Sequence, residues 1–391
     1  MPILYQTIFC FVVSLVISLY LIPVIVRVDR TMKLYDKPNE RSSADTPVPT
    51  LGGIAIFFSF VFVSSFGMIG FDMPEFIFIV AAALLIFFMG LKDDLVNLSP
   101  RKKLITEVIA ACIIIFPAQI RFTNLHGLFG VSEIGMVPGV ILTIFVIVVI
   151  INAFNLTDGI DGLAASLAMM ITAILGTWFL LTGHFEYAIL AFTLLGGVTG
   201  FFYFNVYGNR NKIFMGDTGS LVLGTIVSIL IIRFNEFNID QTQQYAVESV
   251  PAISFGILAY PLIDTIRVMI IRIMQRRSPF AADRNHLHHR LLTLGFTHQK
   301  ATYTIVGINI VFIAVLFALH SIGILRLTTY IFLSGGILCM IPAYFIRKRN
   351  LILKNDPVQH LYSPKYSPKP ITAESVKRQE VPAGYPTASD N

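Results

Sequence analysis

The sequence is poor in charge, and this scarcity sets the class of the protein. Only 13% of its 391 residues are Asp, Glu, Lys or Arg, about half of the ~25% usual in soluble domains, and 55% are hydrophobic. The mean hydropathy is +0.73. So few charged side chains cannot cover an apolar protein in water, which excludes a soluble enzyme, a disordered scaffold and a nucleic-acid-binding domain.

Cysteine is scarce as well. Cys10, Cys112 and Cys339 all lie in apolar segments, and no two of them form a C-x-x-C pair. This argues against a disulfide framework or a cysteine metal site and predicts buried structural thiols. The chain also lacks a G-x-x-x-x-G-K-[ST] loop, so a nucleotide would have to be bound by other means.

Long apolar runs occupy most of the chain. A helix that crosses lipid needs about 20 mainly apolar residues. Eleven segments approach this length: Ile3–Val26, Leu51–Ile69, Glu75–Leu91, Leu104–Ile120, Val137–Ile151, Leu163–Thr182, Phe185–Phe204, Ser220–Ile232, Val250–Ile271, Thr302–His320 and Leu327–Ile346. We therefore predict an all-α integral membrane protein with about eleven transmembrane helices.

The basic residues predict the orientation of these spans. If the first connecting loop is inside the cell and the loops alternate, all but three of the 29 Lys and Arg residues lie inside. The exceptions are Arg121, Arg233 and Arg326. Positive charge concentrates on the cytoplasmic side of membrane proteins, so the N-terminus is predicted outside and the C-terminus in the cytoplasm.

The spans predict one large domain followed by a tail. Residues 1–349 are predicted to form a polytopic transmembrane domain, which would carry any catalytic groups. Residues 350–391 are basic and rich in Pro and Ser, a composition that cannot bury a core, so they are predicted to be a disordered cytoplasmic tail.

Adjacent carboxylates end the third predicted span. Asp93 and Asp94 follow Lys92 and precede Arg101-Lys102-Lys103. Neighbouring carboxylates repel, so one binds its proton more tightly unless a cation lies beside it. The pair is typical of a divalent metal site or a general base, whereas a helix end alone would need only one Asp.

The segment Asn152–Gly162 carries the densest set of polar residues. Asn152, Asn155, Asp158 and Asp161 recur every three residues, which places them on adjoining helical positions. No Lys or Arg lies in this inner loop, so its carboxylates lack a local counter-charge and a metal ion is a natural partner. Polar groups at a membrane-embedded helix end usually serve function.

Asp217 precedes the eighth span between two glycines, Gly216 and Gly219. A carboxylate there could cap the helix, and capping is a fair explanation for Thr218 and Ser220. The glycines, which allow close approach, favour a ligand-binding role for Asp217.

A histidine cluster, His286-Leu-His288-His289-Arg290, follows the ninth span. Arginines at 284 and 290 flank the imidazoles, which favours recognition of an anion such as a diphosphate, with zinc as the alternative. The other five histidines, His298 among them, have no such context and are interpreted as ordinary surface or interface residues.

Two further charged groups have simpler explanations. The segment Asp36–Arg41 is consistent with a solvated turn that carries basic topology signals. Asp264 and Arg267, three residues apart in the ninth span, are predicted to form a neutralising ion pair, with catalysis as the alternative.

Together these groups predict metal-assisted chemistry on anions at the membrane surface. Oxygen ligands favour Mg²⁺, or Mn²⁺, over zinc. The metal would bridge a diphosphate while a carboxylate activates or orients an attacking oxyanion. Such a site is suited to a lipid phosphate and a soluble nucleotide.

Four motifs in this order resemble the polyprenyl-phosphate N-acetylhexosamine-1-phosphate transferases, the bacterial glycosyltransferase family 4, from the first span to about Gln299. They are Asp93-Asp94, Asn152-x-x-Asn155-x-x-Asp158-Gly-x-Asp161-Gly-Leu163, Met215-Gly-Asp217-Thr-Gly-Ser220 and His286-Leu-His288-His289-Arg290-Leu291. The resemblance implies a multi-pass enzyme of the bacterial inner membrane with a cytoplasmic active site. It would transfer a sugar-1-phosphate from a UDP-N-acetylhexosamine to undecaprenyl phosphate and release UMP, using Mg²⁺.

The resemblance also implies roles for these residues. Asn155 and Asp217 would bind the metal, and Asp93 and Asp94, with Asp158, would be catalytic. Lys103 would contact phosphate, Asn152 and Asp161 would shape the nucleotide pocket, and the segment His286, His288, His289 and Arg290 would line the sugar-diphosphate side. Asp93 could serve either direct attack or a covalent intermediate.

The histidine motif also indicates a branch of the family. The peptidoglycan branch, which takes UDP-MurNAc-pentapeptide, usually has three consecutive histidines followed by an apolar residue and Glu. His-Leu-His-His-Arg-Leu instead resembles the branch that uses UDP-GlcNAc to begin O-antigen, enterobacterial common antigen or teichoic acid linkage units. The peptidoglycan enzyme is the alternative function, and a homodimer is left open.

Two readings from other classes compete. Eleven spans without a soluble domain would also suit a secondary transporter, but transporters place coupling carboxylates near the bilayer midplane. Here the aspartates lie at the inner helix ends, and only Asp264 approaches mid-span. A lipid-binding structural protein would not need acidic groups in three separate loops.

Overall fold

The structure is a computed structural model that describes residues 3–32, 48–276 and 285–354. Its contacts divide the chain into two units, Met1–Ile346 and Arg347–Asn391. The bundle and the sites below belong to the first unit. The predicted cluster Asp36–Arg41 and the pair Asp283-Arg284 lie outside the described residues.

Helices form nearly all of the described chain. They are α1 (Ile3–Met32), α2 (Gly52–Gly67), α3 (Phe76–Val96), α4 (Pro100–Ile115), α5 (Met136–Thr157), α6 (Leu163–Leu181), α7 (Phe185–Tyr207), α8 (Gly216–Phe237), α9 (Val250–Ile257), α10 (Ala259–Met274), α11 (Leu287–Thr293), α12 (His298–Ala318) and α13 (Ile324–Lys354). A short 3₁₀ turn, His320–Ile322, joins the last two.

The structure supports an integral membrane protein of mainly helical fold. In the described part of the chain, eight helices are long and apolar enough to cross a membrane, and α2 is a shorter apolar helix. Each of the eleven predicted spans overlaps a helix, but α4 has only 16 residues and the ninth span is divided. The exact number of crossings and the orientation stay predictions.

Two features were not predicted. The chain between α4 and α5 forms an antiparallel hairpin, β1 (Asn124–Leu128) with β2 (Val131–Glu133), so the fold is not purely helical. The ninth span breaks at Leu258 into α9 and α10. Pro261 lies in the first turn of α10 and has no backbone N–H, so it cannot continue the backbone hydrogen bonds of α9. This explains the break.

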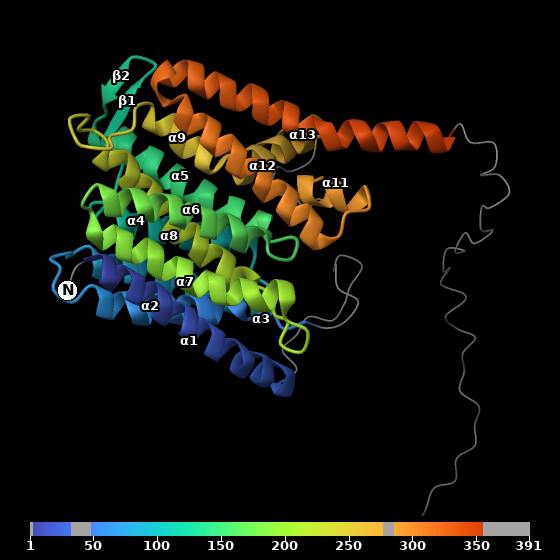
Figure 1. Ribbon diagram of the computed structural model, residues 1–391, viewed down its shortest axis with the longest axis horizontal. Helices are drawn as coiled ribbons and strands as arrows, with labels where there is room; N and C mark the ends of the chain where they lie inside the picture. The colour runs from blue at the N-terminus through green and yellow to red at the C-terminus, as the bar shows by residue number, and fades with distance from the viewer. Residues whose placement is uncertain (1–2, 33–47, 277–284, 355–391) are drawn as a thin grey trace, which may run out of the picture. The chain divides into compact units, whose positions relative to one another are not determined.

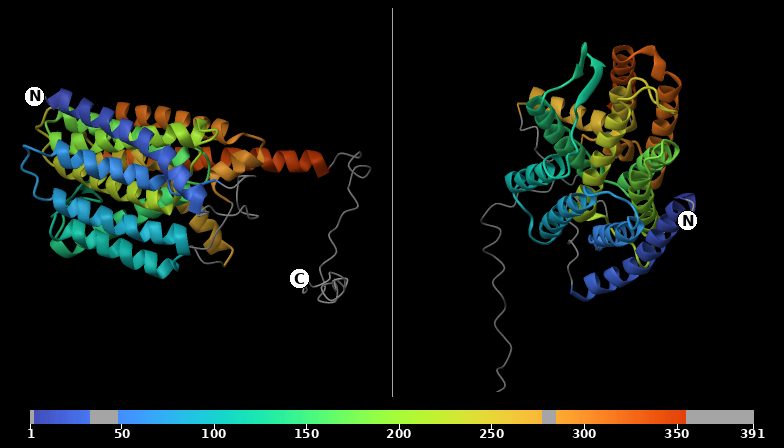
Figure 2. Two further views of the ribbon diagram at one scale, coloured as in Figure 1. Left: turned by 90° about the horizontal axis from the view of Figure 1, so that it is seen from below. Right: turned by 90° about the vertical axis from the view of Figure 1, so that its left-hand side faces the viewer.

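The connections alternate between two ends of the bundle. The hairpin and the start of α1 lie at one end, and α11 and the far end of α1 at the other (Figure 1; Figure 2). Side-chain hydrogen bonds connect residues at the predicted outer ends of the helices: the Tyr187 hydroxyl donates to Glu75, and the Thr123 hydroxyl donates to Glu236. This alternation is what the basic residues predict.

Helix α8 forms the centre of the bundle. It contacts α2, α3, α5, α6 and α9, and 17 of its 22 residues are buried. Its first turn carries Asp217, so the most enclosed helix also positions a predicted functional residue. Residues in such an element can move only if several neighbours move with them.

Candidate active site

A polar cavity of about 550 Å³ lies at the end of the bundle where the predicted inner loops meet. The ends of α3 and α5, the first turns of α4 and α8, and one side chain of α11 line it. Eight predicted site residues share this lining: Asp93, Asp94, Lys103, Asn155, Asp158, Asp161, Asp217 and His289. Asn152, His286, His288 and Arg290 do not line it.

Lys103 joins two helices through their carboxylates. Its Nζ contacts Asp93 Oδ2 of α3 and lies 2.6 Å from Asp217 Oδ2 of α8. The Lys103 and Asp217 side chains are each 26% exposed, and that of Asp93 is 7% exposed. The neighbouring Arg101 and Lys102 are exposed, so Lys103 is the member of this basic run that enters the cavity.

Asp94 holds the first turn of α8. Its Oδ1 accepts a hydrogen bond from the Asp217 N–H at 2.8 Å, and its Oδ2 accepts from the Thr218 N–H and Oγ1 at 2.9 and 2.5 Å. The first N–H groups of a helix have no partner within the helix, so a carboxylate from α3 caps α8. Met215 is the N-cap residue and makes no side-chain bond of its own. The geometry gives Asp94 a positioning role, and its action as a base stays a prediction.

Two glycines allow backbones to meet beside Asp217. A Cβ on Gly53 of α2 would lie 2.1 Å from the Gly219 N, and one on Gly90 of α3 would lie 2.7 Å from Thr218 Cα. No real side chain tolerates such contacts with backbone. The N–H of Gly53 also donates to the Met215 carbonyl at 2.9 Å. The backbones of α2 and α3 therefore pack directly against the backbone of the first turn of α8.

The two asparagines of α5 have different partners. Asn155 Nδ2 donates to Asp217 Oδ1 at 2.8 Å and lies 3.1 Å from Ser220 Oγ. Asn152 Nδ2 donates to Glu107 Oε2 at 2.7 Å. Glu107, buried in α4, was missed in the sequence analysis, although a lone carboxylate inside an apolar span was a signal of function.

The loop between α5 and α6 is fixed from several sides. Lys212 Nζ lies 2.6 Å from Asp161 Oδ2, and His298 Nδ1 lies 3.4 Å from the same oxygen. Burial raises the pKa of Asp161, but His298 and Lys212 outweigh it and leave that pKa below its ordinary value. His298 is thus not the ordinary surface residue that its sequence context suggested, and Lys212 was also missed. Gly162, with a φ of +77°, donates its N–H to Asn205 Oδ1 at 2.6 Å.

Asp158 differs from the other carboxylates of the cavity. Among the described residues its side chain has neither a hydrogen-bond donor nor a paired cation. Burial, followed by the negative charges of Asp217 and Asp94, raises the pKa of Asp158 well above its ordinary value. Among the described residues, Asp158 is therefore the one carboxylate of the cavity that has no partner in the protein.

The histidine motif is anchored by α10. Asp264 accepts from Arg267 at 2.6 Å and from the Leu287 N–H at 3.0 Å, and His286 Nδ1 lies 2.9 Å from its second oxygen. The predicted ion pair of Asp264 with Arg267 is confirmed, and it also fixes the start of α11. A Cβ on Gly159 would lie 2.3 Å from His288 Nε2, so His288 abuts the Asp158 loop while His289 lines the cavity.

The donor chemistry of the cavity suits a hard divalent cation. Five carboxylates and the Asn155 amide supply oxygen, and the Lys103 amine lies among them. In the described residues, however, no three His, Cys, Asp or Glu side chains are already arranged around one metal position. Lys103 instead occupies the space between Asp93 and Asp217.

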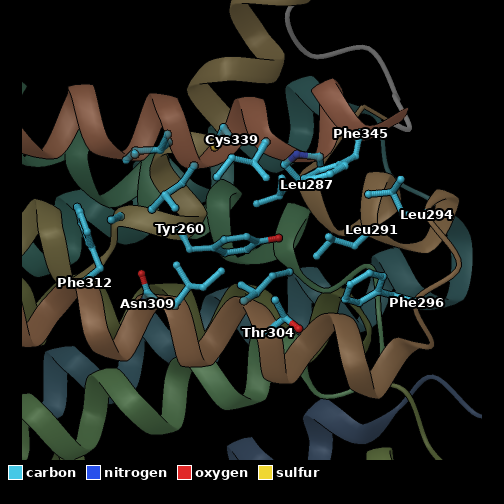
Figure 3. Close-up of a pocket in the computed structure, with 18 residues that line it drawn as sticks. Tyr260, Leu287, Leu291, Leu294, Phe296, Thr304, Asn309, Phe312, Cys339 and Phe345 are labelled. Atoms are coloured by element: carbon cyan, nitrogen blue, oxygen red, sulfur yellow. The ribbon is translucent and has the colours of Figure 1, made fainter. Parts of the chain in front are cut away.

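A second cavity of about 490 Å³ is almost wholly apolar. Helices α10, α11, α12 and α13 line it, and the Tyr260 side chain extends across its middle (Figure 3). The lining residues Ile308, Ile341 and Phe345 are 45%, 44% and 51% exposed, which opens the cavity to the lipid-facing surface. Tyr260 Oη lies 3.4 Å from His288 Nδ1, so a single layer of side chains separates this cavity from the Asp158 loop.

The chain is similar in sequence to several known proteins. The family model described as glycosyl transferase family 4 matches residues 76–235, which include all the carboxylates of the polar cavity. The undecaprenyl-phosphate alpha-N-acetylglucosaminyl 1-phosphate transferase of Escherichia coli K12 is 30% identical over 279 residues, 70% of this chain and 73% of that protein. The protein of the same name from Yersinia pestis is 32% identical over 68% of this chain and 72% of its own. A probable undecaprenyl-phosphate N-acetylglucosaminyl 1-phosphate transferase of Bacillus subtilis 168 is 31% identical over 77% and 82%.

Proposed function

The chain belongs to glycosyl transferase family 4, in the branch of the undecaprenyl-phosphate N-acetylglucosaminyl 1-phosphate transferases, and from this premise we propose what its two cavities do. The protein transfers N-acetylglucosamine 1-phosphate from UDP-GlcNAc to undecaprenyl phosphate. The product begins a cell-envelope polysaccharide. The observation that carries this proposal is the convergence of distant carboxylates, amides and one lysine beside an apolar cavity.

The reaction exchanges one phosphorus–oxygen bond for another. An oxygen of the lipid phosphate attacks the β-phosphorus of UDP-GlcNAc, and the bond between that phosphorus and the bridging oxygen breaks. UMP leaves with the bridging oxygen, and the lipid retains a diphosphate linked to the sugar. Little covalent chemistry is asked of the protein, so positioning and charge stabilisation dominate.

The polar cavity supplies groups for these tasks. Asp217 and Asn155, joined by a 2.8 Å hydrogen bond, would hold Mg²⁺, which when bound neutralises the phosphate charge. Asp158, whose pKa is raised by burial and which has no partner among the described residues, would orient the attacking oxygen or accept its proton. Asp161 faces the nucleotide and is held by Lys212. His289 is the member of the histidine motif that reaches the diphosphate.

The apolar cavity would receive part of the prenyl chain. It opens to the lipid-facing surface, and Tyr260, which extends across its middle, contacts His288 beside the loop that carries Asp158. A chain in this cavity can therefore keep its phosphate at the polar cavity. The basic residues favour a cytoplasmic active site in the inner membrane, where a soluble UDP-sugar is available.

A direct transfer assay tests the function. Purified protein is supplied with UDP-GlcNAc, undecaprenyl phosphate and Mg²⁺, and the mass of the lipid product is measured. Asp217→Asn and Asp158→Asn are expected to lower the rate at least about 10²-fold, because each removes a charge placed for the transition state. Asp240→Asn, an exposed aspartate at the opposite end of the bundle, is the matched control and should keep the wild-type rate.

A donor panel then separates the branches of the family. UDP-GlcNAc, UDP-GalNAc and UDP-MurNAc-pentapeptide are offered at equal concentration. Product from the pentapeptide donor alone would establish the peptidoglycan activity instead. Absence of a lipid-linked product with every donor would refute the transferase proposal, and unchanged activity in EDTA would refute the role of Mg²⁺.

A further inference from the structure

Lys103 holds an unusual position for a cation in a site expected to bind another cation. The first turn of α4 presents three consecutive basic residues, and only Lys103 reaches the cavity. Its ammonium contacts Asp93 and lies 2.6 Å from Asp217 Oδ2. It therefore neutralises carboxylates that come from two different helices and would otherwise repel each other.

This position conflicts with metal binding at Asp217. Mg²⁺ binds oxygen at about 2.0–2.1 Å and demands a nearly complete octahedron of ligands. A lysine ammonium within hydrogen-bond distance of the same carboxylate would lie against the metal and its remaining ligands. Two cations held by the two oxygens of one half-buried carboxylate repel each other, so the ammonium on Asp217 Oδ2 opposes metal binding to Asp217.

The surroundings leave Lys103 free to move. Its side chain is 26% exposed, and a lysine stem is flexible and carries a compact point charge. Asp94, by contrast, is fixed by three donors of α8 and cannot follow. The polar cavity that holds Lys103 also holds Asp158 and His289, so phosphates bound there would lie within reach of the same ammonium.

We propose that Lys103 is an exchangeable counter-ion: it neutralises Asp93 and Asp217 until a divalent metal binds Asp217, and then transfers to the phosphates of the nucleotide. The phosphate ligand in this inference rests on the proposed function. Metal and sugar nucleotide then bind cooperatively, because each stabilises the arrangement that the other requires. Metal binding to the protein alone is correspondingly weak, since the metal must first displace an ammonium.

Manganese binding measures this competition without relying on turnover. Free Mn²⁺ is followed by its electron paramagnetic resonance signal in titrations of detergent-purified wild type, Lys103→Met and Lys102→Met. Lys102 is the matched control, because it is adjacent, exposed and does not line the cavity. Each titration is repeated with saturating UDP-GlcNAc, corrected by a blank that contains the nucleotide and no protein.

The expected pattern is specific. Without nucleotide, Lys103→Met binds Mn²⁺ about tenfold more tightly than wild type, equivalent to about 1.4 kcal/mol. The factor by which UDP-GlcNAc tightens Mn²⁺ binding is smaller in Lys103→Met than in wild type by a similar amount, because no ammonium remains to be released. Lys102→Met behaves as wild type in both titrations.

Other outcomes are equally decisive. Equal or weaker Mn²⁺ binding by a folded Lys103→Met, or an unchanged nucleotide effect, would overturn the exchange and leave Lys103 as a fixed ion pair. If Lys103→Met does not yield a monodisperse protein, Lys103→Gln, which keeps a polar end, is measured in its place. Absence of Mn²⁺ binding in every protein, with transfer that persists in EDTA, would overturn the metal in the proposed function as well.

Discussion

A methyl group at Gly53 would disturb the site without touching any predicted functional side chain. Gly53 lies in the first turn of α2, where its backbone meets the first turn of α8. The added Cβ of Gly53→Ala would lie 2.1 Å from the Gly219 N and 2.6 Å from the Thr218 carbonyl carbon. Both neighbours are backbone atoms, which cannot rotate away as a side chain can.

The size of the effect follows from these distances. Ordinary van der Waals contact begins at 3.4 Å, so the 2.1 Å approach is short by 1.3 Å and the two helices must separate. Overpacking of this kind costs about 1–3 kcal/mol, and the better helix propensity of Ala returns only about 0.5 kcal/mol. A displacement of about 1 Å at a catalytic group can lower the rate about 10²-fold. Asp217 moves with the displaced turn, so activity is expected to fall more than stability.

Two measurements on one preparation check this expectation. Transfer to undecaprenyl phosphate gives the rate, and thermal unfolding in detergent gives the stability. Gly307→Ala is the control, because a Cβ at Gly307 in α12 meets no heavy atom within 4 Å. Wild-type activity and melting temperature in Gly53→Ala would refute the argument that backbone contact between α2 and α8 positions Asp217.

Three further changes test other parts of the structure. Asp94→Ala leaves the first N–H groups of α8 without their acceptor, so thermal unfolding should show a loss of about 1.5–3 kcal/mol, and an unchanged melting temperature would contradict the cap. Burial, followed by the charge of His289, lowers the pKa of His288 to about 3. Below about pH 6.5 this imidazole is therefore protonated in the unfolded chain but stays neutral in the folded chain, so the free energy of unfolding decreases as the pH is lowered. His288→Gln should flatten that fall between pH 6.5 and 4 in unfolding curves, and an identical slope would show that another group causes it. Ile308→Trp, at the mouth of the apolar cavity, should raise the KM for undecaprenyl phosphate several-fold and leave the KM for UDP-GlcNAc unchanged, whereas an equal effect on both would place the prenyl chain elsewhere.

Periodic and compositional signals predicted the helices well. Apolar runs of about 20 residues mark the helices because burial in lipid depends on local composition alone. The same reasoning could not find the break at Leu258, since Pro261 is compatible either with a kinked span or with two helices. The hairpin at Asn124–Leu128 was missed because its short strands carry no clear alternation.

Eight of the twelve predicted site residues line one cavity, but their contacts could not be predicted. Spacing singled out Asp93, Asp158 and Asp217 because carboxylates are expensive at the ends of membrane helices. Only the family resemblance pointed to Lys103 among three consecutive basic residues, and spacing could not show that Glu107 would accept from Asn152, since both contacts depend on the rotation of α4 against its neighbours.

The sequence by itself determined a multi-pass helical protein, the alternation of its loops and the residue types gathered at one end, because each follows from the local balance of apolar and charged side chains. Tertiary structure alone decided which partner each of those residues contacts. Asp94 accepts hydrogen bonds from the first turn of α8, whereas its neighbour Asp93 forms an ion pair with Lys103 of α4. The difference arises because each carboxylate faces a different helix of the packed bundle.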